Sequence, residues 1–311
     1  MVWRIRVARL PMERIVDFFC RKEGPTWAIL VATFACWTAL IVSHEFLPWY
    51  VLAVVGGVIT ALHASLIHES VHCMRSAPKW FRASLFFVPL GVLYPYFIYV
   101  RDHTTHHRDA DLTDPNRDPE SFYYRQDAWQ RMNPVMKMIM TANQTFAGRM
   151  ILGPFIVTIR LIRVEIRRCL NRDGSNLRAW ALHIAGLVLL FAIVSGWAGM
   201  PWWQYIVFIA YPGLAFSLIR SFIEHRSADA PDHRTAIVES GWFFGLLFLN
   251  NNLHVVHHRF PTMKWYEIPA YYRQHRQEIE QGNKGFVFRG YGEVIRRYLF
   301  KPTFAPVQPA V

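Results

Sequence analysis

The chain of 311 residues has few cysteines and no cysteine pair with metal-binding spacing. The four cysteines are scattered and form no CxxC pair: Cys20, Cys36, Cys73 and Cys169. Two of them lie in or near apolar runs, which favours free packing thiols over disulfides or metal ligands. The first 23 residues carry charges throughout, and no small-residue cleavage site follows a short apolar core. The sequence therefore indicates no cleavable signal peptide.

Charged residues are missing from three long stretches of the chain. None occurs at residues 24–44, 46–68 or 179–219, and each of the first two stretches matches the roughly 20 residues that cross a bilayer. The third is long enough for two crossings. The sequence therefore predicts four transmembrane helices in two hairpins, each turning at a Pro-Trp, at about residues 26–44, 48–68, 179–197 and 201–219. The mean hydropathy of only +0.13 indicates that much of the chain lies outside the membrane.

Positive charge is absent from both hairpin turns. All 34 Lys and Arg residues fall in segments 1–22, 75–178 and 220–301, which this topology places on one side of the membrane. The positive-inside rule identifies that side as the cytoplasm, with both termini on it. The net charge of +12 follows from topology, so we expect no nucleic-acid partner. Residues 1–23 predict a basic amphipathic helix on anionic lipid, residues 24–301 the main domain, and the Pro-rich residues 302–311 a disordered tail.

Two shorter apolar stretches are predicted to lie against the membrane without crossing it. Residues 83–100 are interrupted by Pro89, Gly91 and Pro95, and residues 150–159 are too few to span. Both are expected to be interfacial or re-entrant. Residues 160–178 predict a basic helix at the cytoplasmic surface.

Histidines occur in three sequence clusters, here called histidine boxes, on the predicted cytoplasmic side. They read HxxxH at His68 and His72, HxxHH from His103 to His107, and HxxHH again from His254 to His258. Residues three and four apart share a helix face, so each cluster points its imidazoles in one direction. With 14 histidines, one HxxHH arises by chance in about 3% of such chains, so two indicate a built metal site.

Nine of the 14 histidines are predicted metal ligands. His225, just past the fourth predicted helix, joins the eight members of the clusters: His68, His72, His103, His106, His107, His254, His257 and His258. The remaining five are expected to be ordinary packing or surface residues: His44, His63, His183, His233 and His275. One ion cannot use nine imidazoles, so the count predicts two ions. Open positions on a two-metal imidazole site are what iron needs to bind dioxygen.

Ligating histidines usually donate their second N–H to a carboxylate or a carbonyl. The predicted partners are Glu69, Asp102, Asp109, Asp111 and Glu224, together with Asn250, which precedes His254 by one helical turn. The acidic stretch from Asp111 to Glu120 lacks the glycine and ligand spacing of an EF-hand. We interpret it as a Pro-stiffened surface segment.

The order HxxxH, HxxHH, HxxHH, separated by membrane hairpins, resembles the membrane fatty acid desaturase superfamily over roughly residues 25–270. The stretch TDPNRDPESF from Thr113 and NNLHVVHHRFP from Asn251 look like bacterial members. The resemblance implies an all-α fold with a cytoplasmic helical cap, a di-iron centre, and dioxygen chemistry on an unactivated C–H bond of a lipid acyl chain in a bacterial inner membrane. His225 resembles the family's extra histidine. Ser221, four residues earlier, stands where acyl-CoA members have Asn.

The histidine pattern leaves the reaction open. Two hydrogen abstractions give a double bond, whereas one abstraction and oxygen rebound give an alcohol, as in carotenoid ketolases or hydroxylases and alkane hydroxylases. No cytochrome b5-like HPGG segment is present, so we expect a separate electron donor. An acidic ferredoxin would complement the basic cytoplasmic face.

Two further alternatives come from other classes. His68-Glu69-Ser-Val-His72 matches the HExxH pattern of intramembrane zinc proteases. The one Asp-Gly, at Asp173-Gly174, lies in a polar loop where it cannot supply the third zinc ligand, and a protease leaves both HxxHH boxes unexplained. A membrane protein that merely stores metal is the last alternative.

Overall fold

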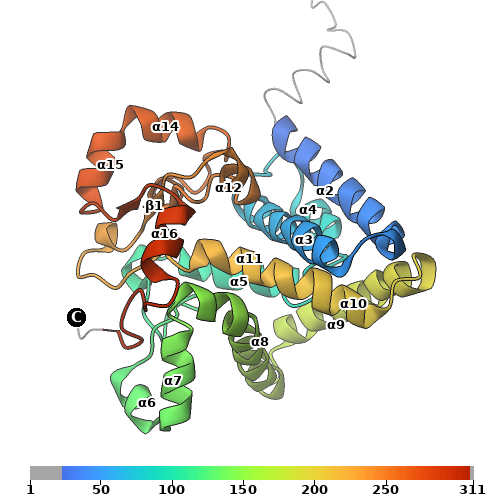
Figure 1. Cartoon of the computed structure of the whole chain (residues 1–311), viewed down its shortest axis with the longest axis horizontal. Coiled ribbons are helices and arrows are strands. Elements are labelled where there is room, and N and C mark those ends of the chain that lie inside the picture. Colours follow the sequence, from blue (N-terminus) through green and yellow to red (C-terminus); the bar gives the residue numbers. More distant parts are fainter. Residues whose placement is uncertain (1–22, 309–311) are drawn as a thin grey trace, which may run out of the picture.

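The computed structural model describes residues 23–308. Residues 1–22 of the predicted amphipathic helix lie outside this part of the chain. Four described helical segments are long and apolar enough to cross a membrane, and they form the two predicted hairpins (Figure 1). The crossings are α2 (Gly24–Val42), α3 (Trp49–His72), α9 with η3 (Gly174–Phe191, Ala192–Trp197), and α10, η4 and α11 together (Trp202–Tyr205, Ile206–Ala210, Tyr211–Ser221).

The third crossing begins five residues before its predicted start. The Asp173 side chain accepts hydrogen bonds from the N–H groups of Ser175 and Asn176 and so caps α9. The prediction used the length of the uncharged stretch, which identifies the apolar part of this helix but leaves out its polar first turn. Segments η3 and η4 are π-helical, and η1 (His44–Phe46) is a short 3₁₀ turn in the first hairpin.

Small residues bring α3 and α11 into close contact at the centre of the bundle. A Cβ atom on Gly213 would lie 1.8 Å from Thr60 Oγ1, and one on Gly57 would lie 2.9 Å from the Phe216 ring. Close approach at glycines is a common way for membrane helices to pack. It joins the helix that carries His68 and His72 to the helix that leads to His225.

Residues 83–100, predicted to be interfacial or re-entrant, do not form one continuous helix. They comprise the end of α4 (Lys79–Leu85), an irregular stretch and the start of α5 (Tyr96–His106). The irregular stretch packs inside the bundle: Leu90 is fully buried, Tyr205 donates its hydroxyl to the Leu90 carbonyl at 2.9 Å, and His183 Nε2 lies 2.8 Å from the Val92 carbonyl. Spanning helices thus satisfy backbone groups that lipid would leave unpaired.

Gly186 of α9 is the point where the irregular stretch touches a spanning helix most closely. A Cβ atom there would lie 2.0 Å from the Phe87 carbonyl oxygen. We expect Gly186→Ala to force the two backbones apart, to cost about 1–3 kcal/mol and to lower the thermal unfolding midpoint in detergent. Gly196→Ala, where a Cβ meets no atom within 4 Å, is the matched control. Equal midpoints for the two variants would show that this contact is not tight.

The segments predicted as 150–159 and 160–178 are wrong as separate elements. Residues 146–170 form one helix, α8 (Phe146–Leu170), bent by 116° from α7 (Pro134–Ala142), and Arg178 already belongs to α9. Exposed Ile151, Phe155, Ile159 and Ile162 lie along α8 among its arginines. Residues 150–170 of the two predicted segments therefore belong to one continuous amphipathic helix, and residues 174–178 begin the next helix.

The remaining elements form the helical cap predicted for the histidine side. Strands β1 (Ile237–Val238) and β2 (Val287–Phe288) pair in parallel. The other elements of the cap are η2 (Asp109–Asp111), α6 (Gln126–Arg131), η5 (Pro231–His233), α12 (Trp242–Leu247), α13 (His254–Arg259), α14 (Ile268–Gln274), α15 (Arg276–Gly282) and α16 (Tyr291–Tyr298).

The prediction of a disordered tail is wrong for residues 302–308. Tyr124 N–H donates to the Pro306 carbonyl at 2.8 Å, Gln308 N–H donates to the Tyr124 carbonyl at 3.0 Å, and Thr303 N–H donates to the Gln144 carbonyl at 2.9 Å. The prolines suit this extended segment because the N–H groups that bind come from other residues. The tail thereby forms part of the cap wall beside residues 122–124.

Candidate metal centre

Three helix ends and one short bridge position the nine predicted histidines. His68 and His72 lie in the last turn of α3, His103 and His106 end α5, and His107 follows as its C-cap. His225 is held by an antiparallel bridge to Thr235 just beyond α11. The third box forms α13, and Asn252 ties it to β1, since its side chain and carbonyl both bond to Val238.

The histidines gather into two adjacent clusters. The five-histidine cluster contains His68, His72, His103, His107 and His257, and the four-histidine cluster contains His106, His225, His254 and His258. Within each cluster the ring nitrogens that face one another all lie within 4.8 Å. The clusters meet where the rings of His107 and His258 stack at 4.5 Å.

The spacing of the ring nitrogens fits shared metal ligation. Nε2 of His103 lies 2.9 Å from Nε2 of His72 and 3.0 Å from that of His107, and His225 Nε2 lies 3.1 Å from that of His106. Two nitrogens each about 2.1 Å from one ion and at right angles to one another are about 3.0 Å apart. The buried Nε2 of His68 makes no hydrogen bond within residues 23–308. These nitrogens therefore point at positions that a cation would fill.

The electrostatics of the clusters also suit a cation. Burial, together with the neighbouring His103 and His258, lowers the pKa of His107 far below its ordinary value, so its imidazole is neutral and available as a donor. Burial opposes protonation of His106 as well, but Glu120 and Asp118 outweigh it and raise the pKa of His106 to about 9. Metal ions and protons compete for such a nitrogen.

Four residues contact the outward ring nitrogens. Asp118 Oδ1 lies 2.9 Å from His106 Nδ1, and Glu120 Oε1 lies 2.9 Å from His103 Nδ1. Glu224 Oε1 and the Asn251 carbonyl lie 3.3 and 3.2 Å from His254 Nδ1. The Asn251 side-chain amide lies 3.1 Å from His68 Nδ1. Each contact turns the other nitrogen of its ring toward the cluster centre.

Of the four predicted carboxylate partners whose side chains the structure describes, Glu224 alone contacts a cluster histidine. Glu69 is buried against Cys73 and the Trp265 backbone, because it follows His68 and so points to another helix face. Asp102 accepts instead from Arg101 Nε at 2.8 Å. Asp111 forms an ion pair with Arg117, and the side chain of Asp109 lies outside the described part.

The prediction for Asn250 is wrong by one residue. Its side chain donates to the Trp265 carbonyl at 2.9 Å, whereas the neighbouring Asn251 contacts His68 and His254. The prediction placed Asn250 one helical turn before His254. However, α13 begins only at His254, and Leu249 and Asn250 have φ values of 48° and 55°. A left-handed turn thus redirects the side chains.

Sequence reasoning missed Asp118 and Glu120 and interpreted their segment as a surface loop. Asp118 is only 3% exposed, and it accepts from the N–H groups of Thr113 and Glu120 as well as contacting His106. The available signal was position: these are acidic residues close after an HxxHH box, which needs carboxylate partners. Mean polarity suggested a surface loop instead.

The five histidines predicted to be ordinary lie outside both clusters. His63 is buried beside the rings of Phe34 and Phe86, His183 contacts the Val92 carbonyl, and His44 contacts the Ile41 carbonyl. His275 contacts the Tyr271 carbonyl, and His233 ends η5.

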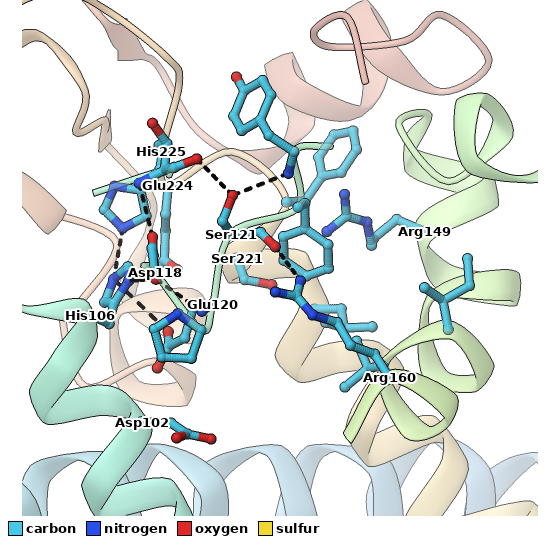
Figure 2. Close-up of a pocket in the computed structure, with 18 of the residues that line it drawn as sticks. Asp102, His106, Asp118, Glu120, Ser121, Arg149, Arg160, Ser221, Glu224 and His225 are labelled. Carbon is cyan, nitrogen blue, oxygen red and sulfur yellow. Dashed lines mark hydrogen bonds and ion pairs between the residues drawn. The ribbon is translucent and has the colours of Figure 1, made fainter. Parts of the chain in front are cut away.

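A cavity of about 190 Å³ adjoins the four-histidine cluster between α5, α8, α11 and the loop at residues 118–124. Figure 2 shows His106 and His225 on one side and Arg149 and Arg160 on the other, with Ser121 and Ser221 between them. Apolar side chains line much of the space, among them Tyr99, Ile156, Leu214, Leu218 and Phe222. An apolar space thus lies directly beside the cluster.

Comparison with known proteins identifies the family of the chain. The chain has no significant match among curated proteins. The model of one protein family, described as fatty acid desaturase, matches residues 46–290, which is most of the chain and includes all three histidine boxes and His225. The two histidine clusters thus belong to a protein of the fatty acid desaturase family.

Proposed function

We propose that this protein is a membrane-bound di-iron oxidoreductase that uses dioxygen to introduce a double bond into a lipid acyl chain. The observation that carries the proposal is the pair of adjacent all-histidine clusters, each of which could hold a metal ion. His68, His72, His103, His107 and His257 would hold one iron, and His106, His225, His254 and His258 the other. When bound, two irons would, with two electrons from a separate donor, reduce dioxygen and supply an oxidant able to take hydrogen from a methylene group.

The protein's own part is to orient the ligands and admit the chain. Asp118, Glu120 and Glu224 accept the outward N–H groups of three histidines and fix those rings. The cavity beside His106 and His225, with its apolar lining from α8 and α11, gives the acyl chain a path from the membrane edge. A site that excludes bulk water suits chemistry on an unactivated C–H bond.

The charge distribution supports a cytoplasmic site and a separate electron donor. Lysine and arginine are absent from both hairpin turns, and by the positive-inside rule this supports a cytoplasmic position for the clusters and the cap. A small acidic ferredoxin-type protein is the partner whose charge fits this basic face. Hydroxylation or ketolation on the same centre would differ from desaturation only in the product, so product analysis distinguishes these reactions.

The geometry of the first box argues against a zinc protease. In that mechanism Glu69 would act as a general base beside the metal held by His68 and His72. Here Glu69 lies against Cys73 and Trp265, and three further histidines complete the cluster instead of a carboxylate ligand.

The first experiment is the metal content of the detergent-purified protein after anaerobic iron reconstitution. We expect about two irons per chain and, with ferredoxin, its reductase and dioxygen, unsaturated acyl products by mass spectrometry. Zinc that persists near one per chain through reconstitution, with little iron, would refute the di-iron assignment. Alcohol products with two irons bound would replace desaturation by hydroxylation.

A further inference from the structure

The cavity beside the four-histidine cluster is lined by two arginines that form no ion pair within residues 23–308. Arg149 is 1% exposed, and neither Arg149 nor Arg160 has a carboxylate partner anywhere in residues 23–308. The carboxylates that line the same cavity are already engaged: Asp102 with Arg101, Asp118 with His106, Glu120 with His103, and Glu224 with Arg220. The two guanidinium groups are thus cations of this cavity that form no ion pair with a described carboxylate.

A structural role accounts for only part of the Arg149 side chain. Its Nε donates to the Asn143 carbonyl at 3.0 Å, its Nη2 lies 3.4 Å from Gln144 Oε1, and its guanidinium stacks on the Phe122 ring at 3.8 Å. The buried Nη1 has no acceptor among the described residues. Burial lowers the pKa of Arg149 to about 9, so the group is still charged at neutral pH. A buried cation with an unused N–H is costly unless a ligand completes it.

Arg160 lines the same cavity, and a backbone carbonyl holds its guanidinium group. Its Nη1 donates to the Ser121 carbonyl, which leaves its other N–H groups for a ligand. Both arginines come from α8, and Figure 2 shows them opposite His106 and His225 across the cavity. An apolar lining from Ile156, Leu214 and Leu218 runs beside them.

We propose that Arg149 and Arg160 bind the acid group of an amphipathic substrate, a carboxylate or a phosphate, whose apolar chain lies along α8 and α11 toward His106 and His225. Guanidinium groups bind either acid through paired, charge-assisted hydrogen bonds. This inference rests on the proposed function, because it specifies the class of molecule that the di-iron site oxidises. The acid group would fix which carbon of the chain faces the cluster.

The test is calorimetric binding of three probes with equal chains, namely decanoate, decyl phosphate and decanol, to the purified protein in one zwitterionic detergent. We expect at least one acid to bind about tenfold or more tightly than decanol. Arg149→Gln and Arg160→Gln should each remove most of this preference, and Arg149→Lys should keep part of it. The exposed Arg163→Gln, on the same helix, is the matched control and should behave as wild type.

The outcomes separate the two proposals. Tighter binding of decyl phosphate assigns the acid to a phosphate, and tighter binding of decanoate assigns it to a carboxylate. Equal binding of all three probes, or an acid preference that survives both Gln variants, overturns the inference. If Arg149→Gln fails to fold, Arg160→Gln decides. Iron counted in the same preparations shows which proposal fails, because an acid preference without iron contradicts only the metal assignment.

Discussion

His106→Ala is expected to remove about one of two bound irons and all measurable turnover while leaving membrane insertion intact. His106 is one of four imidazoles in its cluster, and its Nε2 lies 3.1 Å from that of His225. Three imidazoles hold an ion more weakly than four, and the truncation also leaves the buried carboxylate of Asp118 without its partner. The readouts are iron per chain and product formation.

His233→Ala provides the control for this variant. His233 ends a 3₁₀ turn on the cap and lies outside both clusters, so two irons and full activity are expected. Normal turnover of the His106→Ala protein would rule out the four-histidine cluster as part of the reaction centre. Loss of both irons would show instead that the two clusters bind only as a unit.

Asp118→Asn should weaken iron binding at the four-histidine cluster by about 10- to 100-fold. The buried carboxylate accepts from His106 Nδ1 at 2.9 Å and from the N–H groups of Thr113 and Glu120. Every neighbour of this side chain is a donor, so the amide of Asn must turn its own NH₂ toward one of them. His106 then loses the contact that orients its ring.

Glu120→Gln is the paired variant, because Glu120 contacts His103 of the other cluster. Chelator competition should show weaker retention of one iron in each variant. Spectroscopy of the remaining iron should show that a different cluster is affected. Asp111→Asn, which breaks only the surface ion pair with Arg117, controls for changes to the loop and should retain both irons. Wild-type iron retention in Asp118→Asn would mean that the carboxylate does not orient His106.

The sequence predicted the spanning helices and the nine clustered histidines because each depends on local composition or spacing. It could not predict how the histidines divide. His106 and His107 are neighbours but belong to different clusters, as do His257 and His258. Successive helical residues point about 100° apart, so one HxxHH box feeds two centres, and only the packing of α3, α5 and α13 decides which.

Contacts that depend on irregular backbone could not be predicted from the sequence either. Asn251, in place of the predicted Asn250, contacts His254 because of two left-handed residues just before α13. Asp118 turns inward because Thr113 and Glu120 bind its carboxylate, in a segment whose polarity alone suggested solvent. Neither effect leaves a periodic pattern, so hydropathy and helical spacing do not reveal it.

The ordered tail has a practical consequence for engineering. Residues 303–308 pair with Gln144 and Tyr124, and Phe304 lines the cavity beside the four-histidine cluster. A truncation after Pro302 would delete part of the cavity wall, even though Pro302 is far from every histidine box in the sequence. An affinity tag joined directly to this segment would likewise disturb the cavity wall. We therefore expect a C-terminal tag to need a spacer between it and residue 308.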